Sequence, residues 1–314
     1  MPAQRSRLPG RLAGLVTAAV LLVGLAACGP QAASAGPAKP IRVVDDLGQA
    51  VTVPQPVRRL VVLEPSNFEI VDALGLRREI VGVDTSVPTY TPPPWRKAAQ
   101  GLPSIGPSYP GISVERIVAA RPNLVIATTG ISGLSGLKAL HIPVLILNPQ
   151  SIAGVYHDIE LVGQVTGTET RAQGIVAAMS AEMRALSRQA ARAHTRPLVF
   201  YDLGGLYTAG PHTFITSLIA LAGGVNLGAR LSTQQWPQVS AEQVVAANPS
   251  VILIDPDATT VAKERAIPGF LDTRAGRTGR IEAVPDSAYI NEPSLALVQG
   301  LRELIQLLHP GLLP

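Results

Sequence analysis

The chain has 314 residues, of which 46% are hydrophobic, 4% aromatic and 15% charged. This composition is too apolar and too weakly charged for a disordered chain, and the length suits about two domains of ordinary size. The formal net charge is +4, but residues 1–27 contain three arginines and no acidic residue, which leaves 23 basic and 22 acidic residues in the remainder. We therefore expect a nearly neutral body that does not bind nucleic acid.

Residues 1–27 are typical of a secretory signal peptide, because the arginines precede an apolar stretch of 16 residues. Such a stretch is shorter than the roughly 20 residues that span a bilayer, although an uncleaved signal anchor is the alternative. The sequence LAAC at residues 25–28 resembles a bacterial lipobox, which implies cleavage before Cys28 and its acylation. Residues 28–40 would then be a lipid-anchored flexible tether. We expect the mature protein at the extracytoplasmic face of the bacterial cytoplasmic membrane.

The body begins with a predicted β-hairpin, in which Ile41–Asp45 and Ala50–Val53 flank a turn that contains Gly48. Beyond the hairpin, short runs of Val, Ile and Leu alternate with helical patterns, which favours parallel strands buried on both faces. We predict strands over residues 60–63, 80–83, 124–127 and 144–147, and helices over residues 67–74 and 113–120.

A longer helix is predicted within residues 168–193, where Ile175, Met179, Met183 and Leu186 recur at helical spacing. A helix of about 20–25 residues would be about 30–37 Å long. The alternation then resumes. We predict strands over residues 198–201, 251–254 and 281–284, and helices over residues 213–222, 240–247 and 294–308.

An internal repeat indicates two similar halves. Residues 113–127 (SVERIVAARPNLVIA) and 240–254 (SAEQVVAANPSVILI) are identical at six of fifteen positions, and each begins with a serine that can cap a helix. Gln243 can complete a capping box with the second of these serines. Helix–proline–strand is a common pattern, so chance similarity is the alternative. We predict an α/β protein with an N-terminal lobe at residues 41–157, a long inter-lobe helix region at 158–194 and a C-terminal lobe at 195–314, with a ligand cleft between the lobes.

The sequence contains no nucleophile elbow, phosphate-binding loop, dinucleotide-binding motif or zinc-protease motif. Its single cysteine excludes disulfide frameworks and Cys-based metal clusters, and its five histidines are scattered. We therefore expect no enzyme activity, no resident cofactor and no metal site. The alternatives are a carrier of free metal ions, an enzyme on the same scaffold, and a sensory or adhesive lipoprotein.

Several segments together resemble one protein family. They are the lipobox, the DDLGQAVTVP hairpin at residues 45–54, RLVVLEPSNFE at 59–69, IVGV at 80–83, AGGVN at 222–226 and the two repeats. The chain resembles, over about residues 41–308, the substrate-binding lipoproteins of ABC importers for iron–siderophores, haem and cobalamin. The resemblance implies two Rossmann-like lobes, with parallel sheets flanked by helices, joined by one long rigid helix. It also implies a monomer that works with an ABC permease dimer and its ATPase and is anchored to the lipid bilayer through Cys28.

The same resemblance implies that one glutamate on each lobe docks onto the permease. The matching residues are Glu115 and Glu242, the paired acids of the repeat. A glutamate in the first turn of a helix also interacts favourably with the helix dipole, by about 0.3–1 kcal/mol, and both roles can hold at once.

Ligand-binding candidates come from loops that match the family. The sequence WPQVS at residues 236–240 resembles the family's cobalamin binder, in which this tryptophan lines the cleft. Tyr109 occupies a position where that protein also has an aromatic residue. Tyr90 lies in a similar Tyr-Pro loop that here has two extra residues and lacks one tyrosine. Such rings can stack on a flat corrinoid or porphyrin.

Charged and polar candidates complete the set. Arg230 and Arg96 can meet the oxygen ligands of a ferric siderophore, while Tyr207, Tyr289 and Asn291 follow predicted strands of the C-terminal lobe. Because the loop around Tyr90 departs from the cobalamin pattern, we expect an importer component that captures an iron complex, either a siderophore or haem. A cobalamin-binding protein of the same family is the alternative.

Overall fold

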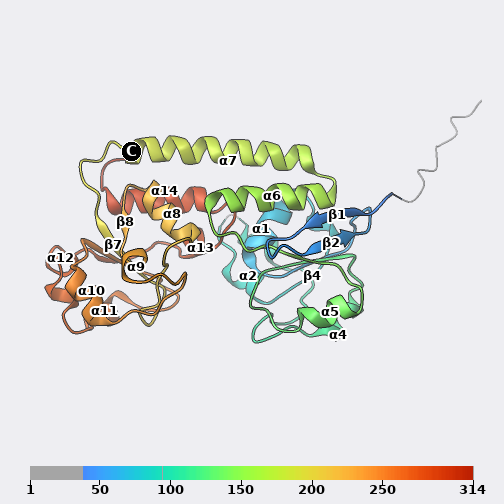
Figure 1. Ribbon diagram of the computed structural model, residues 1–314, viewed down its shortest axis with the longest axis horizontal. Helices are drawn as coiled ribbons and strands as arrows, with labels where there is room; N and C mark the ends of the chain where they lie inside the picture. Colours follow the sequence, from blue (N-terminus) through green and yellow to red (C-terminus); the bar gives the residue numbers. More distant parts are fainter. Residues whose placement is uncertain (1–37, 94, 314) are drawn as a thin grey trace, which may run out of the picture. The chain divides into compact units, whose positions relative to one another are not determined.

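The computed structural model describes residues 38–93 and 95–313 (Figure 1). The expected signal peptide, Cys28 and the tether up to residue 37 lie outside the described residues. The described chain begins with a hairpin of β1 (Ile41–Val44) and β2 (Ala50–Val53), paired antiparallel with Ile41 opposite Val53. Gly48 has a φ of 74° in the turn, a conformation that glycine adopts without strain.

The first sheet contains four parallel strands in the order β4-β3-β5-β6. They are β3 (Leu60–Val62), β4 (Ile80–Val83), β5 (Leu124–Ala127) and β6 (Val144–Ile146). Every residue of β3, β5 and β6 is buried, as the apolar runs predict for strands covered on both faces. We call this sheet and its helices the first lobe. Those helices are α1 (Pro65–Ala73), η1 (Arg77–Glu79), α2 (Ser86–Tyr90), α3 (Arg96–Ala99), α4 (Val114–Ala119) and α5 (Leu134–Ala139).

The second sheet has the order β10-β9-β7-β8 and is also parallel. Its strands are β7 (Leu198–Asp202), β8 (Val225–Asn226), β9 (Val251–Ile254) and β10 (Ile281–Ala283). We call this sheet and its helices the second lobe. Those helices are α8 (Phe214–Leu221), α9 (Gly228–Leu231), α10 (Ala241–Ala247), α11 (Val261–Arg265), η2 (Phe270–Asp272), α12 (Arg274–Arg277), α13 (Ala288–Asn291) and α14 (Leu297–Leu308).

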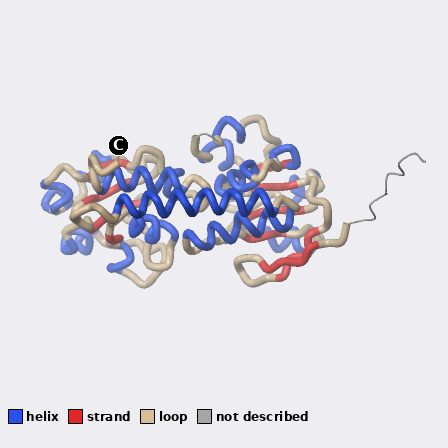
Figure 2. The backbone as a smooth tube through the Cα atoms, turned by 90° about the horizontal axis from the view of Figure 1, so that it is seen from above, coloured by secondary structure: helices blue, strands red, loops and turns tan. Residues whose placement is uncertain are grey.

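The predicted long helix is α7 (Glu169–Ala190), which has 22 residues. It packs against α8 and α14 of the second lobe and against α6 (Ile152–Thr166), which in turn packs against α1 of the first lobe (Figures 1 and 2). A Cβ atom on Gly163 would lie 2.5 Å from the Cβ atom of Ala172, so a side chain at that position would separate α6 from α7. The sequence did not predict α6, and the expected boundary between residues 157 and 158 falls inside it.

One hydrophobic core continues beneath these helices. It includes Val62 of the first sheet, Met183 of α7 and Val199 of the second sheet. The other face of each sheet has a separate core, which contains Ile117 of α4 in the first lobe and Val244 of α10 in the second. The expected fold class, two Rossmann-like α/β lobes joined by a long helix, is therefore confirmed.

The repeat has the same local structure in both lobes. Ser113 caps α4 by accepting a hydrogen bond from the backbone N–H of Arg116 at 3.3 Å. Ser240 caps α10 in the predicted capping box, in which its Oγ accepts from the N–H of Gln243 at 3.3 Å and its N–H donates to Oε1 of Gln243 at 2.9 Å. Each helix precedes a fully buried strand of its sheet.

Across the described ranges, 38–93 and 95–313, no helix is both long and apolar enough to cross a membrane.

Candidate ligand-binding site

Acidic side chains follow the carboxyl ends of strands in both sheets. Glu64 and Asp84 come after β3 and β4, while Asp202 ends β7 and Asp255 follows β9. In open parallel sheets, ligands bind outside the carboxyl ends of the strands. The loops at these ends are therefore the part of each lobe where a ligand is expected.

Four aromatic side chains are about half exposed. They are Tyr90 (53%), Tyr109 (53%), Tyr207 (49%) and Trp236 (46%). The other eight aromatic residues are buried or partly buried in the described chain. All four exposed rings were predicted from the sequence as ligand contacts, and two belong to each lobe. Tyrosine and tryptophan are enriched at interfaces, because each combines an apolar ring with a polar group.

Tyr109 lies beside the loop that follows β5. Its hydroxyl donates to the carbonyl oxygen of Thr129 at 3.4 Å, and Gly111 forms an isolated bridge with Ser132. Burial and the nearby carboxylates of Glu64 and Asp84 raise the pKa of Tyr109. The ring therefore lies close to the acidic ends of β3 and β4.

Tyr207 and Trp236 lie on two segments whose backbones pair with each other in the second lobe. The N–H of Thr208 donates to the carbonyl of Pro237 at 3.0 Å, and Tyr207 forms an antiparallel bridge with Gln238. The indole of Trp236 also packs edge-on against Phe214, with ring centroids 6.3 Å apart. This fixed backbone lowers the ordering cost of binding a ligand against the two exposed rings.

Several hydrogen bonds connect the two lobes. The N–H of Ser66 donates to Glu292 at 3.1 Å, and the hydroxyl of Ser294 donates to Glu69 at 2.5 Å. The loop that carries Trp236 reaches the first lobe through Gln235, whose amide donates to Gln150 at 2.6 Å. The segment that carries Trp236 is therefore linked to the first lobe, and α1 is linked to the segment between α13 and α14.

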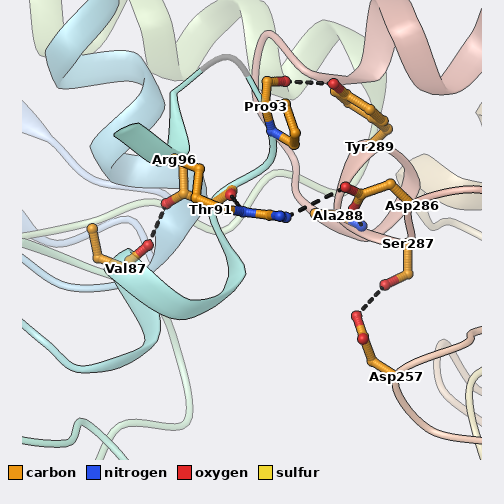
Figure 3. Close-up of polar contacts among 9 residues, drawn as sticks. All are labelled: Val87, Thr91, Pro93, Arg96, Asp257, Asp286, Ser287, Ala288 and Tyr289. Atoms are coloured by element: carbon orange, nitrogen blue, oxygen red, sulfur yellow. Dashed lines mark hydrogen bonds and ion pairs between the residues drawn. The ribbon is translucent and has the colours of Figure 1, made fainter. Parts of the chain in front are cut away.

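Two predicted ligand residues, Arg96 and Tyr289, take part in contacts between the lobes. Arg96 forms an ion pair with Asp286 at 3.4 Å, and the hydroxyl of Tyr289 donates to the carbonyl of Pro93 (Figure 3). Arg96 also donates to the carbonyl of Thr91 at 2.9 Å. Figure 3 shows that these contacts join Pro93 and Arg96 of the first lobe to Tyr289 and Asp286 of the second.

Asn291 also has partners within the protein. Its amide donates to Asp255 at 2.8 Å, and its carbonyl oxygen accepts from the hydroxyl of Tyr201 at 3.0 Å. Tyr289 and Asn291 lie on the short helix α13, which follows β10. Arg230 is exposed on α9.

A group of acidic side chains near Tyr109 was not predicted from the sequence. Burial, followed by repulsion from Asp84, raises the pKa of Glu64 to about 7. Burial, followed by repulsion from Glu64, raises the pKa of Glu292 to about 8. Ser108 donates to Glu64 at 3.1 Å and also to Asp84. We call Glu64, Asp84 and Glu292 the carboxyl cluster. A signal existed in the sequence, because Glu64 and Asp84 each directly follow a predicted strand.

Glu115 and Glu242 are both exposed in the first turns of α4 and α10. The pKa of Glu115 is lowered by its own backbone N–H and by Ser113, and that of Glu242 by Ser240 and its own backbone N–H. Both side chains are therefore anionic at neutral pH and equivalent in their lobes. Among the residues that the structure describes, no group of three or more His, Cys, Asp and Glu side chains is placed to hold a metal ion.

Two α/β lobes with parallel sheets are joined by α6 and α7, and each lobe carries two exposed aromatic rings in segments that follow its strands. This arrangement defines a two-lobed solute-binding protein. The family described as "Periplasmic binding protein" matches residues 60–288, and the chain belongs to that family. It is similar to the uncharacterized ABC transporter substrate-binding lipoprotein YvrC of Bacillus subtilis, with 28% identity over 96% of this chain and 97% of the relative. It is also 32% identical to a cobalamin-binding protein of Halobacterium salinarum, over 86% of this chain and 74% of the relative.

Solved structures agree on the fold. The periplasmic heme-binding protein RhuT from Roseiflexus sp. RS-1 is 30% identical, with a TM-score of 0.69 over 81% of this chain and 100% of that chain. The periplasmic vitamin B12 binding protein BtuF of Vibrio cholerae is 22% identical, with a TM-score of 0.68 over 81% of this chain and 97% of that chain. The expected family is therefore confirmed. The chain is an extracytoplasmic substrate-binding component of an ABC importer, which works with a permease and an ATPase.

Proposed function

We propose that the protein captures a cobalamin-type corrinoid between its two lobes and delivers it to the permease. The observation that carries this proposal is the set of four half-exposed rings, Tyr90, Tyr109, Tyr207 and Trp236, two on each lobe. A flat macrocycle offers two faces for such rings, one toward each lobe. The cargo is a transported chelate and not a resident cofactor.

The charges around the rings favour a corrinoid over an anionic cargo. The carboxyl cluster lies beside Tyr109, and Arg96 is already paired with Asp286. The edge of a cobalamin carries carboxamides, whose N–H groups donate to carboxyl oxygens, whereas the two carboxylates of haem have no N–H to donate. An iron complex, which the sequence favours, is the second candidate, because Arg230 is exposed shortly before Trp236 and can meet anionic oxygen ligands.

Titration of the chain from residue 29 onward with cyanocobalamin, haemin and ferrichrome tests the cargo. Equilibrium dialysis measures binding, and the fluorescence of the two tryptophans reports contact. We expect saturable binding of cyanocobalamin and a quenched signal that Trp236→Phe removes. Saturable binding of haemin or ferrichrome alone would make the cargo an iron complex.

Variants of the exposed rings test the site. Ligand contact would bury the exposed half of each ring, worth about 1–1.5 kcal/mol, so Trp236→Ala and Tyr207→Ala should each weaken cyanocobalamin about tenfold. Leu140→Ala is the matched control, because Leu140 is 55% exposed on α5 of the first lobe but was not predicted to touch the ligand. Equal effects of all three variants would contradict the assigned site.

We further propose that the lipidated Cys28 anchors the protein and that Glu115 and Glu242 dock it, as a monomer, on the permease. Exposure, negative charge and equivalent positions on α4 and α10 support the docking role. Radiolabelled palmitate incorporated into the wild-type protein but not into Cys28→Ser tests the anchor. The docking role is tested by charge reversal, described below.

A further inference from the structure

A pocket lies where α6, α7 and α8 meet. Its volume is about 490 Å³, within the range of sites that bind small molecules. Three helices form it: α6, the middle and end of α7, and the end of α8 in the second lobe. None of its lining residues belongs to the strand-end loops that carry the four exposed rings.

The lining of this pocket is mostly apolar. Ile152 and Tyr156 of α6, Met183 of α7 and Leu221 of α8 form its wall. Met183 is buried and the ring of Tyr156 is partly buried against the core that both lobes share. The pocket is therefore a fixed feature of the helix packing.

Two arginines, Arg184 and Arg188, line the pocket beside its apolar residues. Arg184 and Arg188 lie four residues apart on α7, so they share one helix face. Neither forms an ion pair with a carboxylate in the described part of the chain, whereas Arg302 of α14 pairs with Glu182 of α7 at 2.7 Å. Like charges at this spacing repel each other, so an anion bound to both guanidinium groups would stabilise the helix.

We propose that this pocket binds a single-chain anionic amphiphile of the fatty-acid class. The carboxylate pairs with Arg184 and Arg188, whose planar guanidinium groups match a carboxylate in charge and geometry. The acyl chain lies along Ile152, Met183 and Leu221. This site is separate from the proposed cargo site and does not depend on which chelate the protein carries.

The test is isothermal titration of the protein with sodium laurate below its critical micelle concentration. We expect saturable binding of one laurate per chain, and binding at least about tenfold weaker for the neutral dodecyl maltoside, which cannot form the charge-assisted hydrogen bonds. The double variant Arg184→Gln/Arg188→Gln should lose at least about tenfold in laurate affinity. Arg192→Gln is the matched control, because Arg192 is exposed just beyond α7 and does not line the pocket.

A second variant tests the apolar wall. Ser187 lines the pocket between the two arginines, and Ser187→Phe would fill the space with a ring while leaving both charges in place. We expect it to abolish laurate binding and to leave cargo affinity at the wild-type value. Laurate affinity unchanged in both the double variant and Ser187→Phe would overturn the proposal. So would binding to phosphatidylglycerol vesicles without binding to monomeric laurate, because the surface would then recognise a membrane and not a free amphiphile.

Discussion

Asp158 is a buried carboxyl group whose neutralisation should stabilise the protein. It lies on α6 with 1% of its surface exposed, and neither carboxyl oxygen has a hydrogen-bond partner in the described chain. Nearby Asp46 already accepts a hydrogen bond from the N–H of Asn148 at 2.6 Å. Burial, followed by the negative charge of Asp46, raises the pKa of Asp158 from 3.8 to about 9.

The raised pKa sets both the size and the sign of the effect. Asp158 is protonated in the folded protein and ionised in the unfolded chain at every pH between 3.8 and about 9. The folded state therefore binds more protons, and the free energy of unfolding falls as pH rises through this window. At about 1.4 kcal/mol per pH unit above 3.8, the loss of stability is about 2 kcal/mol at pH 5 and about 5 kcal/mol at pH 7.5.

Asp158→Asn removes this titration while keeping the shape of the side chain. Urea denaturation followed by circular dichroism should show a stabilising effect that is about 3 kcal/mol larger at pH 7.5 than at pH 5. Glu160→Gln on the same helix is the control, because Glu160 is exposed, and we expect no gain that grows with pH. An effect of Asp158→Asn that is equal at the two pH values would refute the reasoning.

Three further predictions concern other parts of the molecule. Charge reversal in Glu115→Arg/Glu242→Arg should leave cargo affinity unchanged but abolish uptake by the reconstituted importer, and uptake at the wild-type rate would show that these residues do not dock. Phe270 is fully buried and packs edge-on against Phe200, with ring centroids 6.5 Å apart. Phe270→Ala should therefore lower the free energy of unfolding by about 3–5 kcal/mol, and a loss below about 2 kcal/mol would contradict its place in the core. Burial lowers the pKa of His309, so the folded protein loses stability as pH falls below about 6.5. His309→Gln should reduce that loss in urea denaturation between pH 7.5 and 5.5. An unchanged dependence of the free energy of unfolding on pH would contradict this prediction.

Local signals in the sequence were sufficient for much of the fold. Each repeat combines a capping serine, a short helix, a proline and an apolar run, and these features act over a few residues. The hydrogen bonds of Ser113 and Ser240 occur as predicted. The spacing of apolar residues within 168–193 likewise predicted α7, because the residues on the buried face of a helix recur every three or four positions.

Helix α6 was missed because its stability depends on a distant neighbour. It contains two glycines and the buried Asp158, all of which lower helix propensity. Gly163 is nevertheless required, since its missing side chain lets α6 approach Ala172 of α7. Close packing between two helices is a tertiary property, so propensity within residues 152–166 gave no indication of it.

The predicted site residues fall into two groups. Those of one group have hydrogen-bond or ion-pair partners within the chain, and those of the other group expose apolar rings. Arg96, Tyr289 and Asn291 have polar groups that find partners elsewhere in the chain, and the partners of Arg96 and Tyr289 lie on the opposite lobe. These partners are more than 30 residues away in the sequence, so the sequence alone could not show that the groups are already engaged. The apolar surface of exposed rings such as Tyr207 and Trp236 cannot form hydrogen bonds. It is stabilised only when it is removed from water.

The polar and the aromatic candidates, which the sequence analysis grouped together as ligand contacts, therefore have different surroundings in the structure. The polar side chains of Arg96 and Tyr289 connect the two lobes. The aromatic side chains remain half exposed because nothing in the described chain covers them, so their apolar surface is available to a ligand. We therefore expect the cargo to contact the half-exposed aromatic side chains before the polar side chains beside them.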